Sequence, residues 1–344
     1  MPFALTDLRA LADLPFDEII DARSPSEFAE DHIPGAINLP SLSDAERAEV
    51  GTIYVQEDPF LARKLGAAYV ARNVADHLQG PLADRTGGWK PLVYCWRGGQ
   101  RSGAFTVILK QIGWRADLVD GGYRAYRRLV SEALYETPWP VPVILIDGNT
   151  GTAKTRLLHQ IAKAGGQILD LEAMAEHRGS LFGPMSEHQP SQKMFESRLA
   201  QALVGLDPAR PVFVEAESSK IGNLMVPPSL WKVMIDAPRY FITAPIEARV
   251  GHLLEEYRDV IGAPATLDAI LAKLIRYHGH EQIAAWRALA GAGDHAALAA
   301  ELVALHYDPR YARITRHDAH VPLDLPDLSE ATLARVAERL LSDS

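Results

Sequence analysis

Twice in this chain a short apolar run leads through a glycine-rich loop into a helical pattern. Residues 91–94 run directly into a loop that begins at Cys95, and residues 143–146 run into a loop around Gly148. Other short apolar runs alternate with helical patterns over most of the first 245 residues. Because strands that alternate with helices form parallel sheets, this order predicts an α/β fold with mostly parallel strands.

Three prolines between residues 136 and 142 divide the chain. Proline excludes helix there, so the stretch predicts a stiff linker. After residue 246, apolar residues recur at helical spacing. We therefore expect an α/β domain over 1–135, the Pro-rich linker 136–142, a second α/β domain over 143–245 and a mainly helical C-terminal part over 246–344.

Charge and composition exclude several classes of protein. A net charge of −9 argues against indiscriminate nucleic-acid binding, although a local basic patch would still permit a nucleic-acid partner. The single cysteine, Cys95, can form neither an internal disulfide nor a thiolate zinc site. The N-terminus is acidic where a signal peptide is basic, and no stretch approaches the ~20 apolar residues that span a bilayer. We expect a cytoplasmic protein with no membrane partner.

The loop after residue 94 combines a thiol with glycines and two arginines. Successive backbone N–H groups in such a loop, together with the helix N-terminus that follows, can surround an anion. Positive charge from Arg97 and Arg101 favours the thiolate, which is the reactive form of cysteine. The pattern predicts catalytic roles for Cys95, Arg97 and Arg101, and an anion loop formed by Gly98, Gly99, Gln100 and Ser102.

Short motifs on either side of this loop resemble those of rhodanese domains. Asp21-Ala22-Arg23-Ser24 and His32-Ile33-Pro34-Gly35-Ala36 look like the entry motif of that family, and Asp120-Gly121-Gly122-Tyr123 looks like its closing glycine turn. The resemblance implies that Cys95 handles sulfur or selenium. The Cys-x5-Arg loop is one residue longer than in simple sulfur-carrying rhodaneses and matches dual-specificity phosphatases of the same fold. Loop length alone therefore allows either selenophosphate or a phosphoester as the ligand.

The second loop matches a Walker A phosphate loop in all but one position. Backbone amides would surround phosphates, Lys154 would reach the outer phosphate, and Thr155 is placed for Mg²⁺. Ala153 stands where the pattern has glycine, so we do not expect nucleoside triphosphate hydrolysis, whereas another diphosphate remains compatible. The predicted phosphate-binding residues are Gly148, Asn149, Thr150, Gly151, Thr152, Lys154 and Thr155.

Acidic and basic residues farther along are further candidates. Glu215 and Glu217 follow an apolar run, so they either reach a phosphate-bound Mg²⁺ or form a solvated strand end. The segment His177-Arg178-Gly179-Ser180, with Phe182, is either a ligand-binding loop through Arg178 or an ordinary turn. No metal site is predicted with certainty.

The order of these motifs along the chain resembles the tRNA 2-selenouridine synthases, in which a rhodanese-like domain precedes a P-loop NTPase-like domain. His306-Tyr307-Asp308-Pro309 with Tyr311 also looks like that family. The resemblance implies replacement of sulfur by selenium in wobble 2-thiouridine of tRNA, with selenophosphate as donor and an S-geranyl intermediate made from geranyl diphosphate. We hypothesise that the cysteine loop handles selenium, the P-loop holds the diphosphate, and the helical part after residue 246 houses the geranyl chain. No tightly bound cofactor is expected, and Mg²⁺ is a candidate.

Residues 91–130 carry seven basic and two acidic residues inside an acidic protein. Either tRNA phosphates run past these arginines or they form solvated helix faces. Two other functions compete with the transferase: a phosphatase or arsenate-type anion enzyme that uses Cys95, and a binding module without catalysis. The candidate tRNA-binding residues are Arg115, Arg124, Arg127, Arg128 and Arg178.

Overall fold

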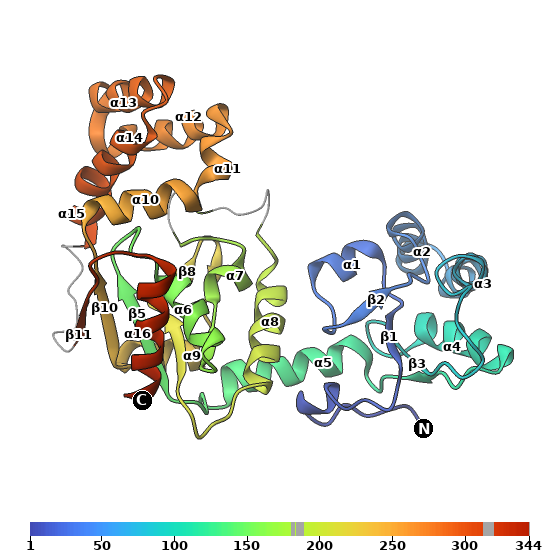
Figure 1. Ribbon diagram of the computed structural model, residues 1–344. Coiled ribbons are helices and arrows are strands. Elements are labelled where there is room, and N and C mark those ends of the chain that lie inside the picture. Colours follow the sequence, from blue (N-terminus) through green and yellow to red (C-terminus); the bar gives the residue numbers. More distant parts are fainter. Residues whose placement is uncertain (180–182, 184–188, 312–319, 344) are drawn as a thin grey trace. The chain divides into compact units, whose positions relative to one another are not determined.

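The computed structural model (Figure 1) describes residues 1–179, 183, 189–311 and 320–343. The chain forms two compact units, one of residues 1–138 and 190–205, the other of residues 139–189 and 206–344. The boundary at Pro138 falls within the predicted linker. Residues 190–205, which we assigned from sequence to the second domain, lie in the first unit. None of the described helices is long and apolar enough to cross a membrane.

The first unit is built on a parallel sheet in the order β2-β1-β3-β4. Its strands are β1 (Glu18–Asp21), β2 (Ala36–Asn38), β3 (Pro91–Tyr94) and β4 (Asp117–Leu118). Register pairs Ile20 with Val93 in the two central strands, and both side chains are fully buried. The helices are α1 (Pro25–Glu30), α2 (Asp44–Gln56), α3 (Pro59–Gln79), α4 (Gln100–Ile112), α5 (Gly122–Ser131) and α8 (Gln192–Val204).

The core of this unit forms where α3 and α4 cover the sheet. Val70 and Val74 of α3 and Phe105 and Leu109 of α4 are buried in one apolar cluster with Val93. Their spacing of four residues places each pair on one helix face. The packing holds the amino end of α4 beside the carboxyl end of β3, which is the junction that carries Cys95.

The second unit has a parallel sheet in the order β11-β10-β5-β7-β6. Its strands are β5 (Val143–Gly148), β6 (Gln167–Leu169), β7 (Val212–Glu215), β10 (Arg239–Thr243) and β11 (His320–Asp324), with a small hairpin of β8 (Lys220–Ile221) and β9 (Leu224–Met225). Strand β11, which was not predicted from the sequence, follows the helical part and pairs with β10. The described helices are α6 (Lys154–Lys163), α7 (Leu171–Ala175), α9 (Pro228–Asp236), α10 (Ile246–Glu256), α11 (Arg258–Ile261), α12 (Pro264–Lys273), α13 (Ile275–Gly291), α14 (His295–Glu301), α15 (Asp308–Tyr311) and α16 (Glu330–Ser342), with a π-helical turn at Leu302–Tyr307.

Two apolar clusters hold the second unit together. In one, Leu157 and Ile161 of α6 and Leu333 and Leu340 of α16 are buried against the sheet. In the other, Leu271, Trp286 and Leu298 bring α12, α13 and α14 into a separate helical core. Figure 1 shows α10–α15 gathered beyond one end of the sheet. Both ends of the helical part are thus attached to the sheet: α10 follows β10, and β11 pairs with β10.

Candidate active site: two anion-binding loops

The cysteine loop joins β3 to α4, as predicted. Cys95 is 3% exposed and directly follows the last residue of β3. Ser102, in the first turn of α4, donates its hydroxyl to Cys95 Sγ at 3.1 Å. Because α4 begins at Gln100, its free N–H groups and positive dipole end lie on the same loop as the sulfur. The predicted residues from Gly98 to Ser102 are therefore brought together with the thiol in one turn.

Backbone contacts from the start of α5 fix the shape of this loop. The N–H of Tyr123 donates to the Cys95 carbonyl at 2.9 Å, and the N–H of Arg124 donates to the Trp96 carbonyl at 3.1 Å. Gly122 has φ +59°, and a Cβ there would lie 2.3 Å from the Cys95 carbonyl oxygen and 2.4 Å from the Gly98 amide nitrogen. Only glycine fits such an approach, which explains the Gly-Gly pair before Tyr123.

Arg101 is held by a carboxylate that the sequence analysis did not include in the site. Its guanidinium donates to Glu27 at 2.6 Å and 3.3 Å, and its side chain is 19% exposed. Burial acts to raise the pKa of Glu27, but the hydrogen bonds and charge of Arg101 outweigh it and lower that pKa. Arg101 is thus fixed beside the loop, whereas Arg97 is exposed. The signal for Glu27 was its place three residues after Ser24, where it completes the capping box of α1.

The predicted tRNA-binding arginines lie in different environments. Arg115, Arg124 and Arg128 are exposed. Arg127 is 18% exposed, and its guanidinium forms an ion pair with Glu196 of α8 and lies 3.8 Å from the fully buried Asp31. Its charge therefore compensates carboxylates inside the first unit.

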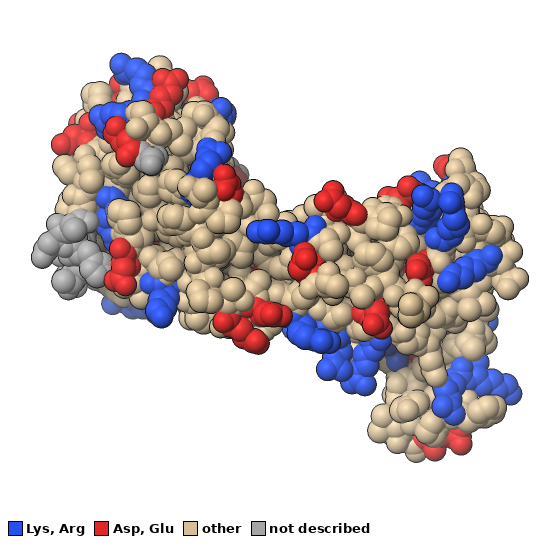
Figure 2. All heavy atoms as spheres, turned by 90° about the horizontal axis from the view of Figure 1, so that it is seen from below, with Lys and Arg blue, Asp and Glu red and all other residues tan. Residues whose placement is uncertain are grey.

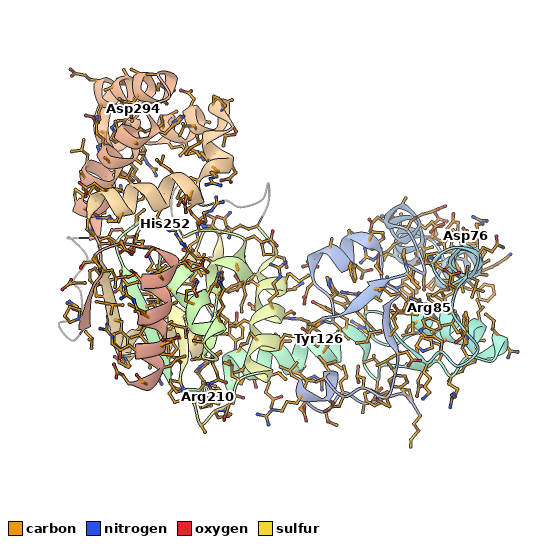
Figure 3. The ribbon with its side chains drawn as sticks, in the orientation of Figure 1. Asp76, Arg85, Tyr126, Arg210, His252 and Asp294 are labelled. Carbon is orange, nitrogen blue, oxygen red and sulfur yellow. The ribbon has the colours of Figure 1, made fainter. Side chains whose placement is uncertain are left out.

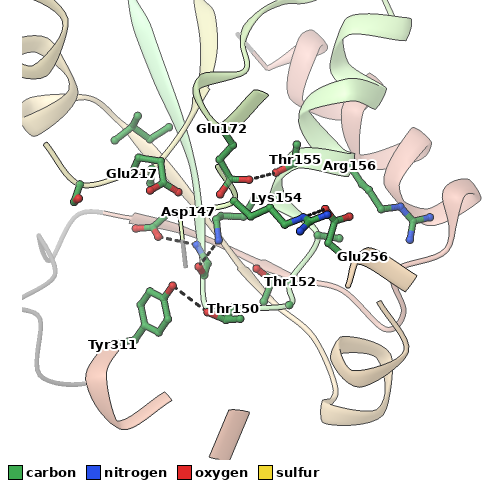
Figure 4. Close-up of a pocket in the computed structure, with 18 of the residues that line it drawn as sticks. Asp147, Thr150, Thr152, Lys154, Thr155, Arg156, Glu172, Glu217, Glu256 and Tyr311 are labelled. Carbon is green, nitrogen blue, oxygen red and sulfur yellow. Dashed lines mark hydrogen bonds and ion pairs between the residues drawn. The ribbon is translucent and has the colours of Figure 1, made fainter. Parts of the chain in front are cut away.

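The second loop joins β5 to α6 and has the form of a phosphate loop. Lys154, the first residue of α6, donates from Nζ to the Gly148 carbonyl at 3.1 Å, so its side chain folds back over the loop (Figure 4). Gly151 has φ +85°, and Ala153 has φ +59° and ψ +37°. The position where the Walker pattern has glycine is thus left-handed here and filled by a buried alanine, a conformation that costs an L-residue roughly 1–2 kcal/mol.

Side chains from the C-terminal part form hydrogen bonds with the phosphate loop. Arg249 of α10, 7% exposed, donates to the Thr150 carbonyl at 2.7 Å and 3.1 Å and to Asp308 at 2.8 Å. Asp308 also accepts from the Asn149 amide at 2.8 Å, and the hydroxyls of Thr150 and Tyr311 lie 3.2 Å apart. The motif at residues 306–311 therefore contacts the phosphate loop directly, a role that the sequence analysis had not assigned to it.

A pair of carboxyl groups lies beside Lys154. Thr155 donates its hydroxyl to Glu172 at 3.1 Å, and Glu172 interacts with Glu217. Burial, followed by repulsion from Glu217, raises the pKa of Glu172 to about 8. Burial acts to lower the pKa of Lys154, but the acidic groups around it outweigh that effect and raise it. The pair therefore holds a proton at neutral pH, while Lys154 stays charged.

The two acids predicted at the end of β7 differ in position. Glu217 lines the cavity above the loop, whereas Glu215 is fully buried and accepts a hydrogen bond from the Leu171 N–H at 3.0 Å. Burial raises the pKa of Glu215 well above its ordinary value. Glu215 thus supports the start of α7, and of the two acids only Glu217 lines the cavity.

The cavity has a volume of about 770 Å³ and lies over the phosphate loop (Figure 4). Besides Lys154 it is lined by Arg156, Arg178, Arg239 and Arg310. Arg178 is 13% exposed and pairs with Glu256 at 3.2 Å, as does Arg239 with Asp147 at 3.3 Å. Ser180 and Phe182, in the segment after Arg178, lie outside the described residues. Five acidic residues line the same cavity: Asp147, Asp170, Glu172, Glu217 and Glu256. The basic residues are therefore largely balanced, and it is Lys154 with the loop amides that suits a phosphate group.

His252 is another lining residue that the sequence analysis missed. Figure 3 shows it on α10, and it lines the cavity over the phosphate loop. Burial, together with the charge of Arg156, lowers the pKa of His252 to about 4. The imidazole is therefore neutral at pH 7 and adds no charge to the cavity.

The residues near Thr155 have the donor chemistry that Mg²⁺ prefers. The Thr155 hydroxyl and the Glu172 and Glu217 carboxyls supply oxygen ligands. Among the residues that the structure describes, no group of three or more His, Cys, Asp and Glu side chains could hold a metal ion by itself. A magnesium ion here would need oxygens from the ligand and from water to complete its shell.

Comparisons with known proteins agree with this architecture. Residues 4–129 match the model of the rhodanese-like domain, and residues 141–268 match that of the tRNA 2-selenouridine synthase AAA domain. Proteins named tRNA 2-selenouridine synthase are 38% identical over 259 residues in Nitrosomonas europaea, 34% over 252 in Bdellovibrio bacteriovorus and 36% over 264 in Pseudomonas syringae pv. syringae. These matches cover 74%, 70% and 73% of this chain, and 66%, 64% and 68% of the relatives, so the chain spans about two thirds of their length. The chain belongs to the tRNA 2-selenouridine synthase family.

Proposed function

We propose that the protein is a tRNA-modifying transferase that replaces sulfur by selenium in 2-thiouridine at the wobble position. The observation that carries the proposal is the presence of two differently built anion loops, one with a thiol and one with a phosphate-loop lysine, in a chain of this family. The relatives are named for 2-selenouridine in tRNA. Selenophosphate would serve as the selenium donor, and geranyl diphosphate as the source of an S-geranyl intermediate.

In the first step, the P-loop would hold the diphosphate. The thiouridine sulfur attacks C1 of the geranyl group, so a C–S bond forms, the C–O bond breaks, and diphosphate leaves with the electron pair while the base loses its N3 proton. Lys154 would release the Gly148 carbonyl and neutralise the leaving diphosphate. When bound, Mg²⁺ would supply additional charge neutralisation, held by Thr155 and Glu217 together with diphosphate oxygens.

In the second step, the cysteine loop would present selenophosphate. Its selenium adds to C2 of the base, the C–S bond breaks, and geranyl thiol leaves after taking up a proton. The Cys95 thiolate then takes the phosphoryl group, so that an S–P bond forms and the Se–P bond breaks, with selenium keeping the electron pair on the base. Water hydrolyses the S–P bond, which releases phosphate and restores the thiol. The loop amides from Gly98 to Ser102 and the exposed Arg97 would bind the phosphoryl oxygens beside Cys95.

Mass spectrometry of nucleosides tests both steps. Thiouridine-containing tRNA is incubated with wild type, Cys95→Ala or Lys154→Ala, with geranyl diphosphate alone, selenophosphate alone, or both. We expect geranylated uridine with the first substrate and selenouridine with both. Cys95→Ala should lose selenation but keep geranylation, and Lys154→Ala should lose geranylation by at least 100-fold. Lys163→Ala, at the other end of α6 and in an exposed ion pair, is the matched control. Unmodified tRNA with wild type under all three conditions would refute the proposal.

Exposed arginines of the first unit are the proposed contacts to tRNA phosphates. In the view of Figure 2, basic and acidic side chains are interspersed, and Lys and Arg form small groups rather than one continuous field. We expect the combined variant Arg115→Ala/Arg124→Ala/Arg128→Ala to weaken tRNA binding and to reduce the slope of log affinity against log salt by about 1 per lost contact. Arg63→Ala/Arg72→Ala, on the exposed side of α3, is the charge control. An unchanged slope in the first variant would remove this surface from the proposal.

A further inference from the structure

A second, smaller cavity of about 60 Å³ lies within the helical part of the second unit. Its walls come from α10, α11, α12, α14 and the π-helical turn after α14. Val260, Leu267, Leu298 and Leu302 are buried in these walls. The residues that line the cavity are Thr150, Leu253, Leu254, Tyr257, Val260, Ile261, Leu267, His295, Leu298, Ala299, Leu302 and Tyr307.

This cavity shares part of its wall with the cavity over the phosphate loop. Thr150, Leu253, Tyr257 and Tyr307 line both. Leu253 packs closely against the phosphate loop, since a Cβ added at Gly151 would lie 3.0 Å from the Leu253 side chain. A ligand whose phosphates lie on the loop amides therefore has an apolar space beginning at the other side of Thr150 and Leu253.

The chemistry of the wall selects the class of group that fits there. Among the described residues that line the cavity there is no Lys, Arg, Asp, Glu, Asn or Gln, and the polar side chains are Thr150, Tyr257, His295 and Tyr307. The wall therefore offers few partners for the edge of a nucleobase or for a sugar. Burying such polar groups without hydrogen bonds is unfavourable and weakens binding. Leucine, isoleucine and valine side chains instead favour a hydrocarbon. A ligand that satisfies both cavities has phosphates at one end and a hydrocarbon chain at the other.

The volume limits the length of that chain. About 10–15 Å³ measured in this way holds one water molecule, so 60 Å³ corresponds to roughly four to six water-sized atoms. That is about one five-carbon isoprene unit. A chain of two units would place its first unit along Leu253 and Tyr257 and its second unit inside the cavity, whereas a third unit would need the wall to move.

We propose that this cavity holds the distal isoprene unit of the prenyl diphosphate bound at the P-loop, and that Ile261, Leu298 and Ala299 limit the chain to about two units. The inference rests on the proposed function, because it specifies the organic part of the same ligand. It differs from that function in assigning the length of the hydrocarbon chain to particular side chains of α11 and α14.

Competition binding with four probes tests the inference on the full chain: inorganic pyrophosphate, dimethylallyl diphosphate, geranyl diphosphate and farnesyl diphosphate. Wild type should bind the ten-carbon compound at least tenfold more tightly than pyrophosphate. Ala299→Leu fills the cavity and should weaken geranyl diphosphate binding about tenfold while leaving pyrophosphate binding unchanged. Ile261→Ala enlarges it and should raise the affinity ratio of farnesyl to geranyl diphosphate about tenfold. Ala296→Leu, at an exposed position of the same helix, is the matched control.

The outcomes separate this inference from the proposed function. If wild type binds no prenyl diphosphate more tightly than pyrophosphate, the geranyl step of the proposed function fails as well. If wild type prefers geranyl diphosphate but both variants keep its chain-length preference, the chain lies elsewhere and only this inference is overturned. Ala299→Leu that raises thermal stability without any change in affinity identifies the cavity as a packing void, which also overturns it. If Ala299→Leu weakens all four probes equally, the ratio of farnesyl to geranyl diphosphate affinity in Ile261→Ala is the deciding measurement. A raised ratio supports the inference, and an unchanged ratio overturns it.

Discussion

The cysteine loop and the phosphate loop each join the carboxyl end of a central strand to the helix that follows, but different contacts hold the two loops in shape. Backbone groups brace the cysteine loop, through Gly122, Tyr123 and Arg124. Side chains brace the phosphate loop, through Arg249 and Asp308, which lie about a hundred or more residues farther along the chain. The first loop should therefore depend on glycines, and the second on buried charge. Each of the following substitutions tests one side of that difference.

The largest effect is expected from Arg249, the buried member of an ion pair beside the phosphate loop. Arg249→Met removes its ion pair with Asp308, which is 34% exposed, and both hydrogen bonds to the carbonyl of the buried Thr150, which together should cost about 4 kcal/mol. Hydrogen exchange read by mass spectrometry should show faster exchange in β5 peptides and unchanged exchange in β3 peptides. Arg287→Met removes an Arg–Asp pair of the same type that is 42% and 55% exposed, and should cost less than about 1 kcal/mol. Equal effects of the two variants would contradict side-chain bracing.

The next largest effect is expected in the cysteine loop. Gly122→Ala combines a left-handed backbone with a 2.3 Å approach to the Cys95 carbonyl oxygen, and should cost about 3 kcal/mol. Exchange should then increase in peptides around residues 95–102 and not in β5. Gly103→Ala, in the helix that follows the same loop, is the control, because no atom beyond the helix backbone lies within 4 Å of the added Cβ and helical backbone accepts alanine. A Gly122→Ala variant as stable as Gly103→Ala would show that the backbone contacts do not determine the loop.

The buried carboxyl group of Glu172 should make the second unit sensitive to pH. Its pKa is raised to about 8 in the folded chain from an unfolded value of 4.5, so the folded state binds more protons between these values. Stability should fall as pH rises from about 5 to 8, and Glu172→Gln should remove about 2 kcal/mol of that fall. Urea unfolding at a series of pH values measures it. Glu255→Gln, 61% exposed on α10, should leave the slope unchanged, and an unchanged slope in Glu172→Gln would show that this carboxyl is ionised in the folded protein.

The smallest effect has the opposite sign. Ala153 is buried at φ +59°, so Ala153→Gly relieves a strained backbone and should stabilise the second unit by about 1 kcal/mol. The same substitution at Ala162, exposed in the last turn of α6, should destabilise it by about 0.5 kcal/mol. Thermal unfolding of the two variants provides the comparison. Destabilisation by Ala153→Gly would mean that the alanine methyl packs well enough to offset the strain.

Local pattern predicted the two loops well and their support poorly. The strands before Cys95 and Gly148, and the helices after them, follow from apolar runs, glycines and helical spacing that lie within a few residues. The contacts of Glu27 with Arg101 and of Arg249 with Thr150 join residues 74 and 99 positions apart, and no period in the sequence encodes them. The same holds for β11, whose only signal was a short stretch after a long helical region, and for α8, which follows the phosphate loop in sequence but packs in the first unit.

The placement of α8 also affects how the chain is made. The chain leaves the first unit after residue 138, returns to it at residue 190 and leaves it again after residue 205. Ribosomes add roughly 5–20 residues per second, so the 67 residues from 138 to 205 take about 3–13 s to synthesise. During that interval the nascent cysteine-bearing unit lacks α8, and the Arg127 guanidinium lacks its Glu196 partner. A gene split after residue 138 would put α8 on a different polypeptide from the unit in which it packs, so the cysteine-bearing unit could be completed only by association of the two products.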